Sequence, residues 1–236
     1  MSDRQKPVII LACQVMQSLI QPHLATDEDI PSTYLDYGLH IRPEKMTPTL
    51  QDQLDALPEP SLVLIGYGLC GNGLAGLKAG PHTLVIPRAD DCITILLGSY
   101  QAYIQTFREQ PGTYYLTKGW LESGSDPLKE YRSYVDRYGM ENADSLIDMM
   151  YGRYKRLCFV AHNQADLDEY RPLAMEVAEF CAQRWNMTYE ERIGSDGLIR
   201  RLLEAPRRPG DLGEDFVVIR PGGTVEQMMF IRRPEV

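Results

Sequence analysis

The sequence has no apolar run long enough to span a membrane, and its opening residues lack the hydrophobic stretch and cleavage site of a secretion signal. It also lacks an excess of basic residues, because 24 Lys and Arg stand against 33 Asp and Glu, a net charge of -9. Binding to a phosphate backbone depends on neutralisation by Lys and Arg, so nucleic acid is not an expected partner. We expect a cytoplasmic protein that does not enter a membrane.

Several catalytic and ligand-binding motifs are also missing. There is no Gly-x-Ser-x-Gly, so a Ser-His-Asp hydrolase is unsupported. No glycine-rich segment ends in Gly-Lys-Ser/Thr, which excludes a standard P-loop. The Asp-x-His-x-x-Gly pattern of base-off corrinoid carriers is absent, and so is any Cys-x-x-Cys pair. A metal site would therefore have to use cysteines that are far apart in the sequence.

The pattern of the remaining residues predicts an α/β fold with mainly parallel sheets and flanking helices. Apolar, β-branched runs alternate with helical patterns, which is typical of βαβ units. The expected strands are 8–13, 33–37, 62–66, 83–86, 113–117, 156–162, 187–192 and 216–220. The expected helices are about 14–24, 43–57, 92–110, 127–138, 142–154, 171–185 and 196–203.

The second part of the chain repeats the β-α-β-α-β order of the first. Aligning IILACQ with CFVAHN pairs Cys13 with His162, and LVLIGYG then falls on FVVIRPG. We interpret this order as a pseudo-duplication. It predicts an N-terminal α/β half, residues 1–125, that carries the functional site, and a C-terminal α/β half, residues 126–236, packed closely against it.

Three of the five cysteines follow predicted strands of the first half: Cys13, Cys70 and Cys92. Ligands of open parallel sheets bind at the carboxyl ends of the strands, so these three thiols are expected to meet at one edge. Soft thiolates suit iron–sulfur clusters or zinc better than magnesium or calcium. Cys158 lies inside a strand pattern and Cys181 on an apolar helix stripe, so we interpret both as core residues.

A loop with four glycines surrounds Cys70. Its glycines allow left-handed backbone and close approach, so it can wrap a cluster or direct N–H groups toward an anion. Nucleotide binding at this loop is a weaker alternative. The predicted cofactor-binding residues of the loop are Gly66, Gly68, Gly71, Asn72 and Gly73.

Other polar residues follow the same predicted strands. His162, by its alignment with Cys13, and His40 are both candidates for a fourth metal ligand, with an ordinary loop histidine as the alternative for His162. Arg42 and Arg88 are predicted to bind a small anionic ligand or to offset the charge of a thiolate-bound cluster.

These motifs resemble one known family, the domain-of-unknown-function family 1638 of anaerobic bacteria and archaea. The similarity extends over nearly the whole chain. It rests on ILAC (10–13), DYGLHIRPE (36–44), GYGLCGNGLAGL (66–77), IPRADDCITILLGS (86–99) and PGTYYLTKGW (111–120). The resemblance implies cysteines at the positions of Cys13, Cys70 and Cys92, and a setting near corrinoid-dependent methyltransferases in anaerobic one-carbon metabolism.

The leading hypothesis is an iron–sulfur protein whose three cysteines hold a cluster, [4Fe-4S] being favoured, with one position left open or exchangeable. Zinc bound by the same thiolates in a methyltransferase-type protein is the first alternative. The second is a non-enzymatic accessory module that binds a corrinoid or a nucleotide. Corrinoid methyltransferase proteins are the expected partners, whereas no catalytic residue is predicted.

Overall fold

The computed structural model describes residues 6–24, 30–40, 42–207 and 212–232. The chain forms two compact units, one made of residues 1–100 and 195–236 and the other of residues 101–194. This division differs from the predicted halves 1–125 and 126–236. The reason is that the end of the chain returns to the sheet in which the chain began.

The first unit is built on a five-stranded sheet with the order β2-β1-β3-β4-β8. Its strands are β1 (Val8–Cys13), β2 (Ser32–Leu35), β3 (Leu62–Gly66), β4 (Thr83–Pro87) and β8 (Phe216–Ile219). The first four run parallel, with Ala12 beside Gly66 in the β1–β3 register. β8 is antiparallel to β4, with Leu84 opposite Ile219.

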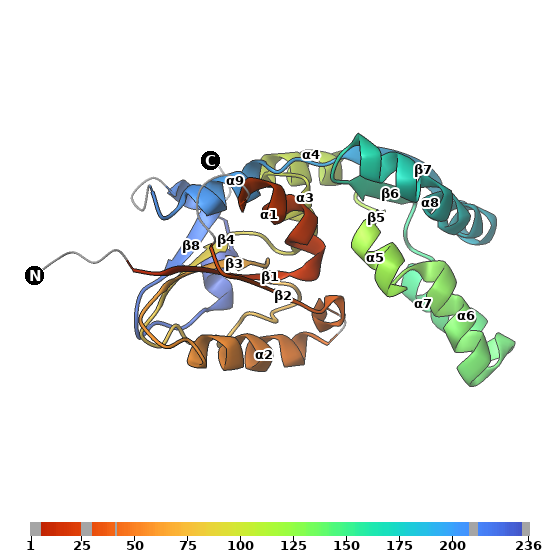
Figure 1. The fold of residues 1–236 in the computed structure, drawn as a ribbon. Helices are drawn as coiled ribbons and strands as arrows, with labels where there is room; N and C mark the ends of the chain where they lie inside the picture. The colour runs from red at the N-terminus through yellow and green to blue at the C-terminus, as the bar shows by residue number, and fades with distance from the viewer. Residues whose placement is uncertain (1–5, 25–29, 41, 208–211, 233–236) are drawn as a thin grey trace, which may run out of the picture. The chain divides into compact units, whose positions relative to one another are not determined.

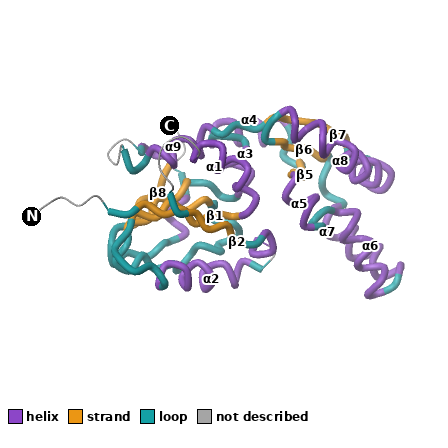
Figure 2. Tube along the Cα trace, in the orientation of Figure 1, coloured by secondary structure: helices purple, strands orange, loops and turns teal. Residues whose placement is uncertain are grey.

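Helices cover both faces of this sheet. They are α1 (Gln17–Leu24), α2 (Pro43–Asp55), α3 (Cys92–Leu96) and α9 (Gly197–Glu204), together with short 3-10 turns at Gln14–Met16, Tyr37–His40, Gly213–Asp215 and Gln227–Phe230. Figure 1 shows α1 and α9 over one face and α2 over the other, and Figure 2 shows the strands side by side between them. The sheet is therefore doubly wound, which explains why its strands are apolar on both faces.

One long helix was expected over 92–110, and two are found. α3 ends at Leu96, and α4 (Tyr100–Glu109) begins after Gly98, whose φ is +84°. A Cβ on Gly98 would lie 2.4 Å from the Cβ of Ser195, where the chain re-enters the first unit. The close approach of these two segments therefore requires glycine and breaks the helix.

The second unit has a three-stranded parallel sheet with the order β5-β6-β7. Its strands are β5 (Thr113–Thr117), β6 (Arg156–Ala161) and β7 (Thr188–Ile193), and its helices include α5 (Lys118–Ser123), α6 (Pro127–Tyr138), α7 (Met140–Tyr151) and α8 (Gln164–Trp185). Leu157 and Phe159 face the core against these helices, with Ile147 and Val177 among the packing residues. The helix expected at 171–185 begins earlier, since Asn163 accepts a hydrogen bond from the Asp166 N–H as its N-cap.

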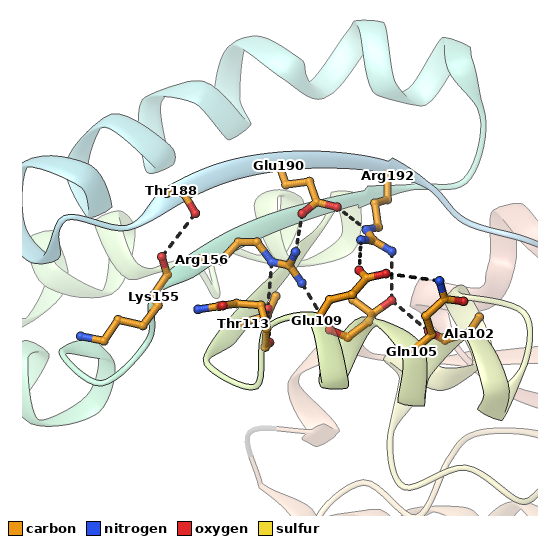
Figure 3. Close-up of polar contacts among 11 residues, drawn as sticks. Ala102, Gln105, Glu109, Thr113, Lys155, Arg156, Thr188, Glu190 and Arg192 are labelled. Atoms are coloured by element: carbon orange, nitrogen blue, oxygen red, sulfur yellow. Dashed lines mark hydrogen bonds and ion pairs between the residues drawn. The ribbon is translucent and has the colours of Figure 1, made fainter.

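The opposite face of the second sheet carries an ionic network (Figure 3). Arg156 on β6 donates to Thr113 Oγ1 at 3.0 Å and pairs with Glu190 of β7 at 2.5 Å. Arg192 pairs with Glu190 and, at 2.7 Å, with Glu109 of α4. These bonds attach α4 to the sheet and satisfy the buried guanidinium of Arg156.

The α/β fold class with mainly parallel sheets is confirmed. The repeated order of elements is also present, but its last strand, β8, pairs with β4 rather than with β7. The second sheet consequently lacks the strand that the pseudo-duplication required. None of the described helices is both long and apolar enough to cross a membrane.

Candidate functional site

The three cysteines of the predicted site lie at one edge of the first sheet. Cys13 is the last residue of β1, Cys70 lies in the loop after β3, and Cys92 is the first residue of α3, after β4. These strands are parallel neighbours. Cys13 and Cys70 both act electrostatically on Cys92, and Cys13 also acts on Cys70. The topology therefore brings the three thiols together.

This edge is the topological switch point of the sheet. From β1 the chain passes through α1 to β2 on one side, and then through α2 to β3 on the other. In doubly wound sheets the loops at such a point diverge toward opposite faces, and ligands bind there. Cys13 and Cys70 lie on the two sides of that point.

Direct backbone contacts hold the loops after β3 and β4 against each other. The Leu69 N–H donates to the Ala89 carbonyl and the Cys70 N–H to the Asp90 carbonyl, both at 2.8 Å. A Cβ on Gly68 would lie 2.8 Å from the carbonyl carbon of Asp91. Only glycine fits there, so the spacing between the segments that carry Cys70 and Cys92 is fixed by the backbone.

The cysteine of the glycine-rich loop has an unusual backbone conformation. Cys70, Gly71 and Asn72 follow one another with φ of 47°, 63° and 68°. The left-handed region costs a non-glycine residue about 1 kcal/mol or more. The turn is closed by a hydrogen bond of 3.1 Å from the Gly73 N–H to the Cys70 carbonyl. Such strain is retained where it directs a side chain toward a site.

Burial dominates the electrostatics of the thiols. It raises the pKa of Cys13 to about 11 and that of Cys70 to about 12, and it raises the pKa of Cys92 well above its ordinary value. Negative neighbours add to this effect, Asp36 for Cys13 and Asp91 for the other two. Among the described residues, no Lys, Arg or His belongs to the strongest charges acting on these thiols. All three are therefore protonated at neutral pH when no cation is bound.

A buried tyrosine lies among the thiols. Tyr67 is 2% exposed, and its hydroxyl is buried without a hydrogen-bond partner. The groups that act on it are Cys13, Cys70 and Asp36, and Cys13 is the first of them. Sequence reasoning missed this residue. The signal was a bulky side chain between two glycines, directly after a strand that ends at the predicted site.

The thiols are not arranged around a single point. Within the described ranges, no three Cys, His, Asp or Glu side chains could together hold one metal ion. A zinc ion binds thiolate at about 2.3 Å, which places tetrahedral sulfurs about 4 Å apart. A cluster binds each cysteine at a different iron and thus accepts wider separations.

The comparison with protein families decides what the chain is related to. A family model described as "Protein of unknown function (DUF1638)" matches residues 34–203, more than half of the chain. The chain belongs to this family. Cys70 and Cys92 lie inside the matched segment, whereas Cys13 precedes it. No curated protein and no solved structure matches the chain.

In this DUF1638 chain, three glycines of the loop make room for protein atoms. A Cβ on Gly66 would lie 2.5 Å from the Cβ of Ala12, and one on Gly73 would lie 2.8 Å from the sulfur of Met46. Gly68 makes room for Asp91 in the same way. Gly71 and Asn72, in contrast, form the exposed tip of the loop. The backbone of this tip is therefore accessible for contacts to a ligand.

The two arginines expected at the site lie at its margins. Arg42 is exposed, and the Pro43 that follows it contacts the loop tip, with its Cγ 3.5 Å from where a Gly71 Cβ would be. The Arg88 N–H donates to the Asp215 carbonyl at 2.7 Å, and its Nε is buried without a hydrogen-bond partner. Neither guanidinium is among the strongest charges acting on the thiols.

The two histidines predicted as candidates for a fourth ligand are His40 and His162, and the structure describes the side chain of His162 alone. The side chain of His40 lies outside the described part of the chain. His162 belongs to the second unit, where its Nδ1 lies 3.3 Å from Asp166 Oδ2. The structure therefore provides His162 with a carboxylate neighbour and does not assemble it with the three cysteines inside one unit.

The remaining cysteines have no thiol neighbours of this kind. Cys158 and Cys181 are fully buried, and burial raises the pKa of each to about 12. The charged groups that act on Cys158 are Glu190 and two arginines, and Asp126 acts on Cys181. Both are packing residues of the second unit.

Proposed function

We propose that Cys13, Cys70 and Cys92 hold an iron–sulfur cluster, with [4Fe-4S] as the favoured type. One observation carries the proposal. Three thiols at the ends of three neighbouring strands lie near Asp36 and Asp91, and no cationic side chain of the described residues is among their strongest electrostatic neighbours. Such an arrangement gains stability from a bound cationic centre, which would turn mutual repulsion of thiolates into attraction.

Chemistry of the free thiols is a poorer explanation of the same residues. A nucleophilic or redox-active cysteine has a lowered pKa, because the thiolate is the reactive form. Here burial raises all three pKa values, with Cys13 at about 11 and Cys70 at about 12. Metal binding removes these protons, so the raised values are compatible with ligands and not with activated nucleophiles.

The separation of the thiols favours a cluster over zinc. The described residues contain no group of three that could hold one ion, and the backbone contact at Gly68 opposes closer approach of the two loops. A zinc site would need these loops to move, whereas a cluster could bridge them. Gly68 packs against the Asp91 backbone, whereas the glycines of a nucleotide-binding loop direct their backbone toward phosphate. This contact makes nucleotide binding the weaker alternative.

Three cysteines leave one iron of a [4Fe-4S] cluster for another ligand. The exposed tip at Gly71 and Asn72, with Arg42 beside it, could admit a small anionic ligand to that position. When bound, such a cluster supplies electrons or acts as a Lewis acid. The one-carbon setting implied by the family resemblance remains part of the proposal, with corrinoid methyltransferases as candidate partners.

The test is anaerobic purification followed by iron, zinc and acid-labile sulfide analysis. We expect a brown protein that contains iron and sulfide in similar amounts and bleaches in air. The double variant Cys158→Ser/Cys181→Ser is the matched control, because it retains all three proposed ligands and should keep the cluster. Stoichiometric zinc without sulfide would replace the cluster by the zinc alternative, and a metal-free folded protein would overturn both.

A further inference from the structure

We propose that Tyr67 donates a hydrogen bond to the Cys13 sulfur and thereby raises the reduction potential of the cluster. Tyr67 would be a positioning residue that acts through a ligand. This inference rests on the proposed function, because the potential exists only if the cluster is held. The inference adds to the proposed function by naming a side chain that sets the reduction potential of the cluster.

The strand register places the two side chains together. Ala12 lies beside Gly66, the last residue of β3, in the parallel β1–β3 pair, so Cys13 and Tyr67 directly follow two aligned residues. Side chains alternate between the faces of a sheet, and aligned residues of neighbouring strands point to the same face. Gly66 lies close to Ile20 of α1, with 3.4 Å from its ideal Cβ to the Ile20 Cδ1. Cys13 and Tyr67 therefore point to the opposite face, which α2 covers.

The glycine-rich loop approaches the same face. Gly73 lies against Met46 of α2, and the Thr47 hydroxyl donates to the Gly73 carbonyl at 2.6 Å. The loop thus brings Cys70 toward the side on which Cys13 and Tyr67 point. This agrees with the electrostatic action of both thiols on Tyr67.

The hydroxyl of Tyr67 is an unsatisfied buried hydrogen-bond donor. It is buried without a hydrogen-bond partner, and the Cys13 thiol is among the side chains that act on it. A buried hydroxyl without a partner costs about 1–3 kcal/mol. A ligating thiolate is a stronger acceptor than a thiol, so metal binding at Cys13 would satisfy this donor.

A hydrogen bond to a ligating sulfur has a defined effect on the cluster. Reduction adds one electron, and the sulfurs carry part of the added negative charge. A donor aimed at such a sulfur stabilises the reduced state more than the oxidised one and so raises the potential. Removing the donor should make reduction harder.

The experiment is a one-electron spectroelectrochemical titration of the anaerobically purified full chain, with the electrode as the electron source. We expect Tyr67→Phe to retain iron and sulfide while its reduction equilibrium becomes about tenfold less favourable, which is about 59 mV for one electron. Replacement of Tyr67 by 3-fluorotyrosine, a stronger donor, should shift the potential in the opposite direction.

Tyr34→Phe is the matched control. Its hydroxyl is also buried, but Tyr34 is aligned with Ala12 and so points to the α1 face, and no thiol is among the groups that act on it. Its potential should equal that of the unaltered protein. Equal potentials in all variants, with the cluster present, would overturn the role of Tyr67 alone. Absence of a cluster from the unaltered protein would overturn the proposed function as well.

Discussion

Both units of this protein carry ionisable side chains at the carboxyl ends of parallel strands, but the charges at these two edges are balanced differently. At the edge of the second sheet, Lys118 Nζ lies 3.1 Å from Asp166 Oδ1, and His162 lies 3.3 Å from the other oxygen of that carboxylate. At the edge of the first sheet, three thiols lie near two carboxylates, and the part of the chain that the structure describes shows no such cation among the strongest charges acting on them. An edge that neutralises itself is structural, and an edge that does not is a candidate site for a cation.

The cysteines of the two units teach the same lesson. Burial raises the pKa of Cys70 and of Cys181 alike to about 12, so the pKa does not separate a proposed ligand from a core residue. The property that does separate them is the presence of other thiols nearby. The Cys13 thiol acts on Cys70, which in turn acts on Cys92, whereas no thiol is among the groups that act on Cys181.

The largest effect is expected from replacing one thiol in each unit. Cys70→Ser should lose nearly all cluster iron while the protein stays folded, because a hydroxyl is a poor substitute for a soft thiolate. Cys181→Ser should keep its iron and lose about 1–3 kcal/mol of stability, since it buries an extra polar group. Metal analysis and urea unfolding measure both. Equal iron contents in the two variants would remove the distinction between the units.

The second prediction concerns the contact that spaces the two loops. Gly68→Ala should destabilise the first unit by about 3 kcal/mol and reduce its iron content, because the new methyl would lie under 3 Å from the Asp91 backbone. Gly112→Ala is the control in the second unit, where the nearest atoms would lie 3.4 Å away or further. Iron retained at full level in Gly68→Ala would show that the loop spacing does not matter for the cluster.

The sequence was sufficient to predict which cysteines share an edge. Cys13, Cys70 and Cys92 each follow an apolar, β-branched run, and the carboxyl ends of parallel strands lie at one edge whatever the strand order. Cys158 lies inside such a run and Cys181 on the apolar stripe of a helix pattern, which assigned both to the core. These inferences depend on local periodicity and a general rule of topology.

Features that depend on tertiary pairing could not be predicted. The run FVVI at 216–219 reads as a strand, but nothing local indicates that it pairs with β4 rather than β7. The division into units therefore differed from prediction. Aligning His162 with Cys13 had the same weakness, because a shared order of elements does not create a shared site. Tyr67 was missed because its role depends on the register between β1 and β3.

A smaller effect is expected from the ionic network of the second unit. Arg156→Met should destabilise that unit by about 2 kcal/mol, because Arg156 is 9% exposed and Glu190 would lose one of its two partners. Arg132→Met breaks an exposed pair with Glu176 and should cost under about 0.5 kcal/mol. Iron content should stay unchanged in both. Loss of iron on replacing Arg156 would contradict the assignment of this network to structure alone.

The smallest expected effect is a pH dependence of the stability of the second unit, caused by His162 at the edge of its sheet. Burial lowers the pKa of His162 to about 4, against an ordinary value of 6.5, so the unfolded chain binds the proton first as pH falls. Stability contributed by the neutral imidazole is thus complete above the unfolded value and decreases through the window between 6.5 and about 4. From about pH 7 to about pH 5.5 the second unit should lose about 1 kcal/mol. Hydrogen exchange at Leu157 and Phe159, in the core strand of that unit, measures this loss, and His162→Gln should abolish the part that its proton causes. An unchanged pH dependence in His162→Gln would show that another group titrates there, and that the second edge is not balanced in the way its geometry indicates.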